Sequence, residues 1–110
     1  MTQTEDLTVG IRRAGGLVTV TVVGEIDIWT GTRLQHVLDT ASADGAHRID
    51  VDFSDVSFCD CSGLTVLLRA RRQARERGIA FRLTRVRSPL VRTLLQRTGT
   101  ADVLAVDDQG

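Results

Sequence analysis

The chain has 110 residues, of which 42% are hydrophobic and 25% are charged, and its 14 basic and 14 acidic residues give a formal net charge of +0. These values are typical of one ordinary globular domain and exclude a largely disordered chain. Because the net charge is zero, no overall field favours nucleic acid or an anionic membrane as a partner. No apolar run approaches the roughly 20 residues that a membrane-spanning helix needs.

The first six residues lack the basic and apolar regions of a signal peptide, so we expect a cytoplasmic protein. Its two cysteines, Cys59 and Cys61, are one residue apart. A disulfide between them would close a very small and strained ring, and thiols stay reduced in the cytosol. We therefore expect two free thiols.

The first part of the chain predicts a hairpin followed by a helix. Apolar residues alternate with other residues from Leu7 to Ile11, Gly15-Gly16 supplies a turn, and a second strand covers 17–23. Both faces of that second strand are apolar, which is typical of a central strand. From about Thr30 the apolar residues recur at helical spacing, and the helix ends near 43–45. Thr30 and Asp27 are the two candidate caps for its start.

The second part of the chain predicts strands that alternate with helices. The expected elements are a strand around 49–53, a loop over 54–60, a helix over 62–77 stopped by Gly78, a strand around 81–83, a helix opened by Ser88-Pro89 and closed by Gly99, and a short strand over 103–106. This order predicts one α/β domain with a mixed sheet of four to five strands and with helices packed mainly on one side.

The segment 57–64 has the strongest chemical signal, because a loop after a strand meets the start of a helix there. Ligand sites in open α/β sheets lie at the carboxyl ends of strands, and a helix start attracts negative charge. Asp60 or Ser62 can equally be a helix cap, and Cys59 a small buried residue. Cys61 would have its thiol at the helix start, where thiols are often reactive.

Patterns for catalysis, cofactors and metals are missing. No Walker-type glycine loop and no dinucleotide fingerprint occur, and zinc would need more ligands at better spacing. No arginine follows either cysteine at the spacing of a tyrosine-phosphatase loop, and nothing brings His36 or His47 to the thiols. We expect an interaction protein without cofactor or metal rather than an enzyme.

Two further features have an ordinary and a functional interpretation. The arginine-rich run 69–77 fits the solvated face of an amphipathic helix, or else a surface for an acidic partner. Trp29, the only tryptophan, fits a core or helix-staple role, or else an interface anchor beside the site.

Several segments of the chain resemble the STAS domain family. The matching segments are 24–27, 51–58, 60–64, 88–92 and 98–99. The resemblance runs from about Leu7 to Val106 and implies a single STAS domain over 1–110. Within the family the chain looks most like the stand-alone anti-sigma factor antagonists of bacteria.

That resemblance implies a mechanism and a surface. Such antagonists bind an anti-sigma factor that is also a serine kinase of the histidine-kinase-like ATPase fold, and binding frees a sigma factor. The kinase then phosphorylates a serine at the start of the second helix, and the added charge separates the complex. The implied partner-binding residues are Asp27, Trp29, Asp60, Cys61, Ser62 and Gly63.

The chain departs from the family pattern at the phosphorylated position, which matches Cys61, while Ser62 matches the second hydroxyl position. Three interpretations stay open: Cys61 makes the protein a constitutive antagonist, oxidation of Cys61 replaces phosphorylation, or Ser62 takes the phosphate. Two other functions stay open as well, a STAS subunit of a lipid-transport ATPase complex or stress-sensing scaffold, and a thiol-based redox protein. The sequence also leaves a homodimer open.

Overall fold

The computed structural model describes residues 7–43 and 45–104 of the chain. In chain order its elements are β1 (Leu7–Ala14), β2 (Leu17–Ile26), α1 (Thr30–Ala43), β3 (Arg48–Cys59), α2 (Cys61–Glu76), β4 (Ala80–Thr84) and α3 (Pro89–Arg97). Within these described ranges they form an α/β domain with a four-stranded mixed sheet and three helices, as the sequence predicts.

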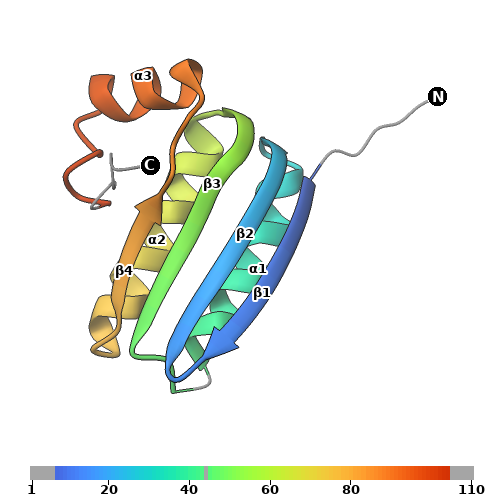
Figure 1. The fold of residues 1–110 in the computed structure, drawn as a ribbon. Coiled ribbons are helices and arrows are strands. Elements are labelled where there is room, and N and C mark those ends of the chain that lie inside the picture. The colour runs from blue at the N-terminus through green and yellow to red at the C-terminus, as the bar shows by residue number, and fades with distance from the viewer. Residues whose placement is uncertain (1–6, 44, 105–110) are drawn as a thin grey trace.

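The strands lie in the order β1-β2-β3-β4 (Figure 1). β1 and β2 form the predicted antiparallel hairpin, whose turn uses Gly15 and Gly16 at φ values of 57° and 88°. Those left-handed values favour glycine, which has no Cβ to clash. β2 pairs with β3 and β3 pairs with β4 in parallel, so the carboxyl ends of β2, β3 and β4 meet at one edge of the sheet.

The core lies between one face of the sheet and the two helices α1 and α2, which both cover that face (Figure 1). The fully buried side chains of β2 are Val18, Val20, Val22 and Ile26, which all point to the same face of the strand. Leu34 and Leu38 of α1 are also almost completely buried. Burial of this apolar face is the main force that holds both helices on the sheet.

The opposite face of the sheet is polar and is joined by an ionic network. The carboxylate of Asp50 on β3 accepts hydrogen bonds from Arg48 and from Arg82 on β4, each at 3.1 Å. Burial alone would raise the pKa of Asp50, but the hydrogen bonds and charges of the two arginines outweigh burial and lower it. This face is therefore stabilised by charge pairing rather than by a helix layer.

The strands β2 and β3 are longer than the sequence predicts. The predicted loop over 54–60 is wrong, because β3 continues to Cys59, and the predicted end of β2 at Val23 is wrong, because β2 continues to Ile26. The two extensions pair with each other, with register shifts after Thr21 and Gly24. These irregularities break the alternation of apolar residues on which the prediction rested.

For the C-terminal part of the chain, the sequence predicts the start of α3 correctly but not the segment that follows it. Ser88 caps α3 and Pro89 is its first residue, which confirms the predicted helix start. The predicted strand over 103–106 is wrong for Val103 and Leu104, which lie in a turn, and the rest of it falls outside the described residues. The carbonyl of Leu104 nevertheless accepts a hydrogen bond of 3.0 Å from the N–H of Leu83, so this turn packs against β4.

Candidate functional site

The starts of α1 and α2 lie together at the edge of the sheet where β2 and β3 end. The backbone N–H of Asp60 donates to the carbonyl of Ile26 at 3.1 Å and joins the two strand ends. α2 begins directly after Asp60, whereas α1 begins after the short loop of Asp27, Ile28 and Trp29. The sequence-predicted site residues are all brought to this edge.

Asp27 caps the first helix. Its Oδ1 accepts hydrogen bonds of 2.9 Å from the backbone N–H groups of Trp29 and Thr30, and the Thr30 hydroxyl accepts one from the N–H of Asp27. The N–H of Thr30 contributes most to a lowered pKa of Asp27, the N–H of Trp29 adds to it, and burial opposes it. The predicted capping role of Asp27 is confirmed, and its side chain is ionised at neutral pH.

Asp60 caps the second helix and also holds Ser62. Its Oδ1 accepts a hydrogen bond of 3.1 Å from the N–H of Gly63 and one of 2.5 Å from the Ser62 hydroxyl. Of the two candidate caps in the sequence, Asp60 is therefore the cap. Ser62 is half-buried, and its proton is held by the Asp60 carboxylate.

The two cysteines on either side of Asp60 have opposite environments. Cys59 is 6% exposed, and burial is the main reason why its thiol pKa rises to about 12. Cys61 is exposed as the first residue of α2, and both cysteines are free thiols. The predicted buried role of Cys59 is confirmed, which leaves Cys61 as the accessible thiol of the site.

Gly63 lets α2 approach the ends of both strands. A Cβ on Gly63 would lie 2.6 Å from Cγ2 of Ile26 and 2.7 Å from Sγ of Cys59, closer than real Cβ contacts. Gly63 is itself buried. Its contribution to the site is to position Cys61 and Ser62, which precede it, at the surface.

Exposed apolar side chains lie in and beside the helix starts. Trp29 is 83% exposed, Ile28 is 65% exposed and Leu90, in the first turn of α3, is 66% exposed. The Ser88 hydroxyl donates to the carbonyl of Ser57 at 3.1 Å and so joins the start of α3 to the end of β3. The core role that the sequence left open for Trp29 is wrong, because most of its side chain is in solvent.

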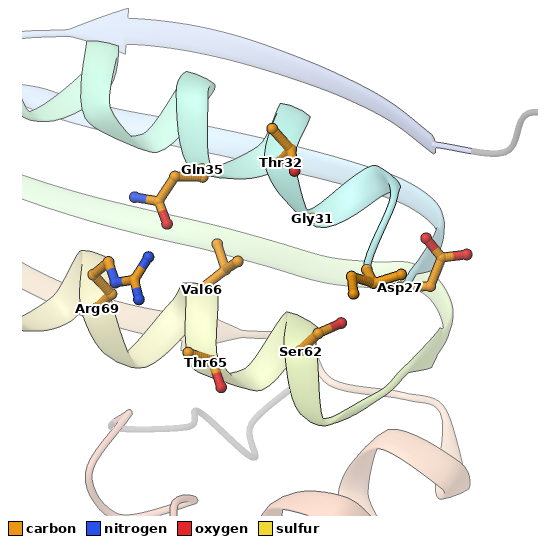
Figure 2. Close-up of a pocket in the computed structure, with 9 residues that line it drawn as sticks. Asp27, Gly31, Thr32, Gln35, Ser62, Thr65, Val66 and Arg69 are labelled. Carbon is orange, nitrogen blue, oxygen red and sulfur yellow. The ribbon is translucent and has the colours of Figure 1, made fainter.

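A groove of about 410 Å³ runs from the helix starts between α1 and α2 (Figure 2). Its lining residues are Asp27, Ile28, Gly31, Thr32, Gln35, Ser62, Thr65, Val66 and Arg69. Sequence reasoning selected only Asp27, Ser62 and the arginine run that begins at Arg69. A glycine in the first turn of α1, Gly31, was the one available sign that the helices leave space there.

The described residues do not support a metal site, a histidine beside Cys61 or a membrane-spanning helix. No group of three or more histidine, cysteine or acidic residues that could hold a metal ion is found within residues 7–43 and 45–104. His36 is exposed on α1, and His47 lies beside Gly16 at the hairpin turn, the far end of β2 from Cys61. In the same ranges no helix has the length and apolar content needed to cross a bilayer.

Comparisons with known proteins find relatives of similar sequence and a solved structure with the same fold. An anti-sigma-B factor antagonist from Listeria monocytogenes is 27% identical over 89 residues, 81% of this chain and 77% of the relative. One from Bacillus subtilis is 25% identical over 101 residues, 92% of this chain and 91% of the relative. The crystal structure of an anti-sigma factor antagonist from Mycobacterium paratuberculosis has the same fold, with a TM-score of 0.85, 24% identity, and coverage of 94% of this chain and 86% of that one.

A family model settles the classification. The model described as "Mlab, STAS domain" matches residues 9–105, nearly the whole chain. The matched range contains both helix starts, the groove and all four strands except the first two residues of β1. The chain therefore belongs to the STAS domain family.

Proposed function

We propose that this protein is an anti-sigma factor antagonist, a cytoplasmic binding protein rather than an enzyme. Its curated relatives from Listeria and Bacillus have that name, and they align with most of the chain. One structural observation carries the proposal: an exposed tryptophan and exposed aliphatic side chains lie at the same end of the sheet as the position that matches the family's phosphorylated serine.

The exposed apolar side chains form a surface suited to a protein partner. We call Ile28, Trp29, Phe58 and Leu90 the apolar rim; Phe58, the least exposed of them, is 39% exposed. Large apolar side chains that gather on one surface mark interaction sites, and tryptophan is enriched among the residues that dominate binding energy. Cys61 is exposed at the same end of the sheet, so a change of charge or size at Cys61 would act within the interface.

The proposed partner is an anti-sigma factor of the serine-kinase type, and its capture frees a sigma factor. In such a pair the kinase can end binding by phosphorylating the start of α2, because a phosphate adds nearly two negative charges to a packed interface. A thiol is not a substrate for a serine kinase. We propose that Cys61 removes this control and leaves the protein a constitutive antagonist.

The geometry of Ser62 argues against a simple shift of the phosphate by one residue. The Ser62 hydroxyl is 2.5 Å from Oδ1 of Asp60, which also caps α2. A phosphate on Ser62 would break this hydrogen bond and place its charge beside the carboxylate. Oxidation of Cys61 remains the alternative control: hydrogen peroxide would convert the thiol into a sulfenic acid and release water.

Affinity capture of partners from the organism's own cytosol, with reductant and with mild peroxide, tests the proposal. Recovery of a kinase-type anti-sigma factor under both conditions is the expected result, and recovery with reductant alone would assign the control to oxidation of Cys61. Recovery of a transport ATPase or a scaffold instead would contradict the proposal and support the alternative STAS functions. Elution of a second copy of the chain would support the homodimer.

Two variants sharpen this test once the anti-sigma factor is purified. With ATP and this kinase, the Cys61→Ser variant should be phosphorylated at residue 61, while the wild-type protein should stay unmodified at residues 61 and 62. Trp29→Ala should weaken binding by about tenfold or more, as expected for an interface anchor. Ile11→Ala is the matched control, because Ile11 is an exposed aliphatic residue in the middle of β1, away from the rim.

A further inference from the structure

We infer that the groove between α1 and α2 continues the partner-binding surface and holds a segment of the anti-sigma factor that carries a carboxylate side chain, which pairs with Arg69. This inference rests on the proposed function. It adds a second contact region, with a stated chemistry, to the apolar rim. Figure 2 shows the groove between the two helices, with Asp27 and Ser62 at one end and Gln35 and Arg69 at the other.

Gln35 supplies the first sign of an occupant. Its Oε1 is buried and has no hydrogen-bond partner among the described residues. Its Nε2 donates to Oδ1 of Asp39 at 3.1 Å, and this bond fixes the amide orientation, because a flipped amide would turn Oε1 against the carboxylate. A buried acceptor without a donor is unfavourable, so a small movement of the Gln35 side chain that lets Oε1 accept a backbone N–H from an inserted segment would be stabilising.

Arg69 supplies the charge. Its side chain is exposed, and within residues 7–43 and 45–104 its guanidinium has no ion pair and no hydrogen bond. Figure 2 shows that it comes from α2 at the end of the groove where Gln35 comes from α1. A planar guanidinium beside apolar surface is well suited to a bidentate carboxylate contact.

The middle of the groove is mainly apolar, which favours a chain segment over a free anion. Gly31 is buried, and a Cβ on it would lie 3.5 Å from Cγ2 of Val66, so the absence of a side chain at Gly31 keeps this part open. A small anion at Arg69 would leave Val66 and Ile28 uncovered. A chain segment would cover them with apolar side chains and reach the helix starts.

The charged residues at the two ends of the groove also determine which end of the bound segment should be acidic. Asp27, ionised at one end, would repel a carboxylate, whereas Arg69 at the other end would attract one. The segment should therefore carry its acidic residue at the Arg69 end and an apolar or basic residue near Asp27. This polarity distinguishes the proposed occupant from a uniformly acidic tail.

The test compares two charge reversals on the same helix by calorimetric titration of the purified anti-sigma factor. Arg69→Glu should raise Kd by about tenfold or more, because it replaces attraction by repulsion inside the interface. Arg72→Glu is the matched control: Arg72 is exposed one turn further along α2, is not part of the groove, and should change Kd by less than about threefold. Thermal unfolding of both variants checks that the fold is retained.

A charge swap identifies the partner residue. The acidic residues of the anti-sigma factor are replaced by arginine one at a time. One such replacement should restore the affinity for Arg69→Glu while weakening the affinity for the wild-type protein. Equal Kd values for Arg69→Glu and Arg72→Glu would overturn the groove inference and leave the proposed function intact. Failure of the wild-type protein to bind any kinase-type anti-sigma factor would overturn both.

Discussion

Asp27 and Asp60 have the same role at the starts of α1 and α2, but the chain around them is arranged differently. After Asp27 the chain makes a loop that leaves Ile28 and Trp29 in solvent, and Gly31 leaves open space beside Val66. After Asp60 the helix begins at once, and the corresponding glycine has no space for a methyl group. One start therefore provides exposed binding surface, while the other holds its first residues in a fixed position.

The largest expected contrast is between the two thiols beside Asp60. In the native protein near neutral pH, N-ethylmaleimide should modify Cys61 and leave Cys59 intact, because Cys59 is buried and its pKa is raised to about 12. Intact-mass measurement over time should show one adduct. Unfolding in urea is the control and should yield two adducts, and rapid double modification of the folded protein would contradict the described burial of Cys59.

The next contrast uses the same substitution at both helix starts. Gly63→Ala should lower the free energy of unfolding by about 1–3 kcal/mol, because its Cβ would overlap Ile26 and Cys59. Gly31→Ala should instead be neutral or stabilise the protein by up to about 1 kcal/mol, since its Cβ finds an ordinary contact 3.5 Å from Val66 and alanine favours the helix.

Urea unfolding at pH 7 measures both glycine variants. Similar changes in both would show that the two helix starts do not differ in packing. Gly31→Ala also bears on the groove: if a partner segment lies there, this variant should bind the anti-sigma factor more weakly than wild type while it unfolds no more easily.

A smaller effect is expected from removal of the second cap. Asp60→Ala should lower the free energy of unfolding by about 1 kcal/mol, because the N–H of Gly63 loses its acceptor. Asp60→Asn should retain most of that stability, since an amide oxygen also accepts at a helix start. If Asp60→Asn were as unstable as Asp60→Ala in urea unfolding, the charge of Asp60 rather than its capping bond would be the main contribution.

The smallest effect concerns the pH dependence of the first cap. Because the folded-state pKa of Asp27 lies below the ordinary value of 3.8, its ionised form stabilises the fold at pH values above that value. This contribution should be lost as pH falls through the lowered folded pKa. The difference in unfolding free energy between wild type and Asp27→Asn should therefore shrink between pH 5 and strongly acidic conditions, and a difference that grows on acidification would contradict the hydrogen bonds assigned to Asp27.

Local patterns were sufficient for most of the fold. Period-two alternation and the Gly15-Gly16 turn predicted the hairpin, and Ser88-Pro89 predicted the start of α3. The ends of β2 and β3 were missed because their pairing is non-local and contains register shifts, which remove the regular period. Leu104 was missed for a related reason, since it meets β4 through one backbone hydrogen bond and not through a strand.

The sequence by itself determined the order of the four described strands and three described helices, the candidate caps at the helix starts and the presence of Cys61 at the position that matches the family's phosphorylated serine. These features depend on neighbours within a few residues. Only the tertiary structure decided that Trp29 is exposed, that Gly63 is enclosed by Ile26 and Cys59, and that Gln35 and Arg69 share a groove. Burial and contact between helices depend on residues far apart in the chain, and packing on the sheet brings them together.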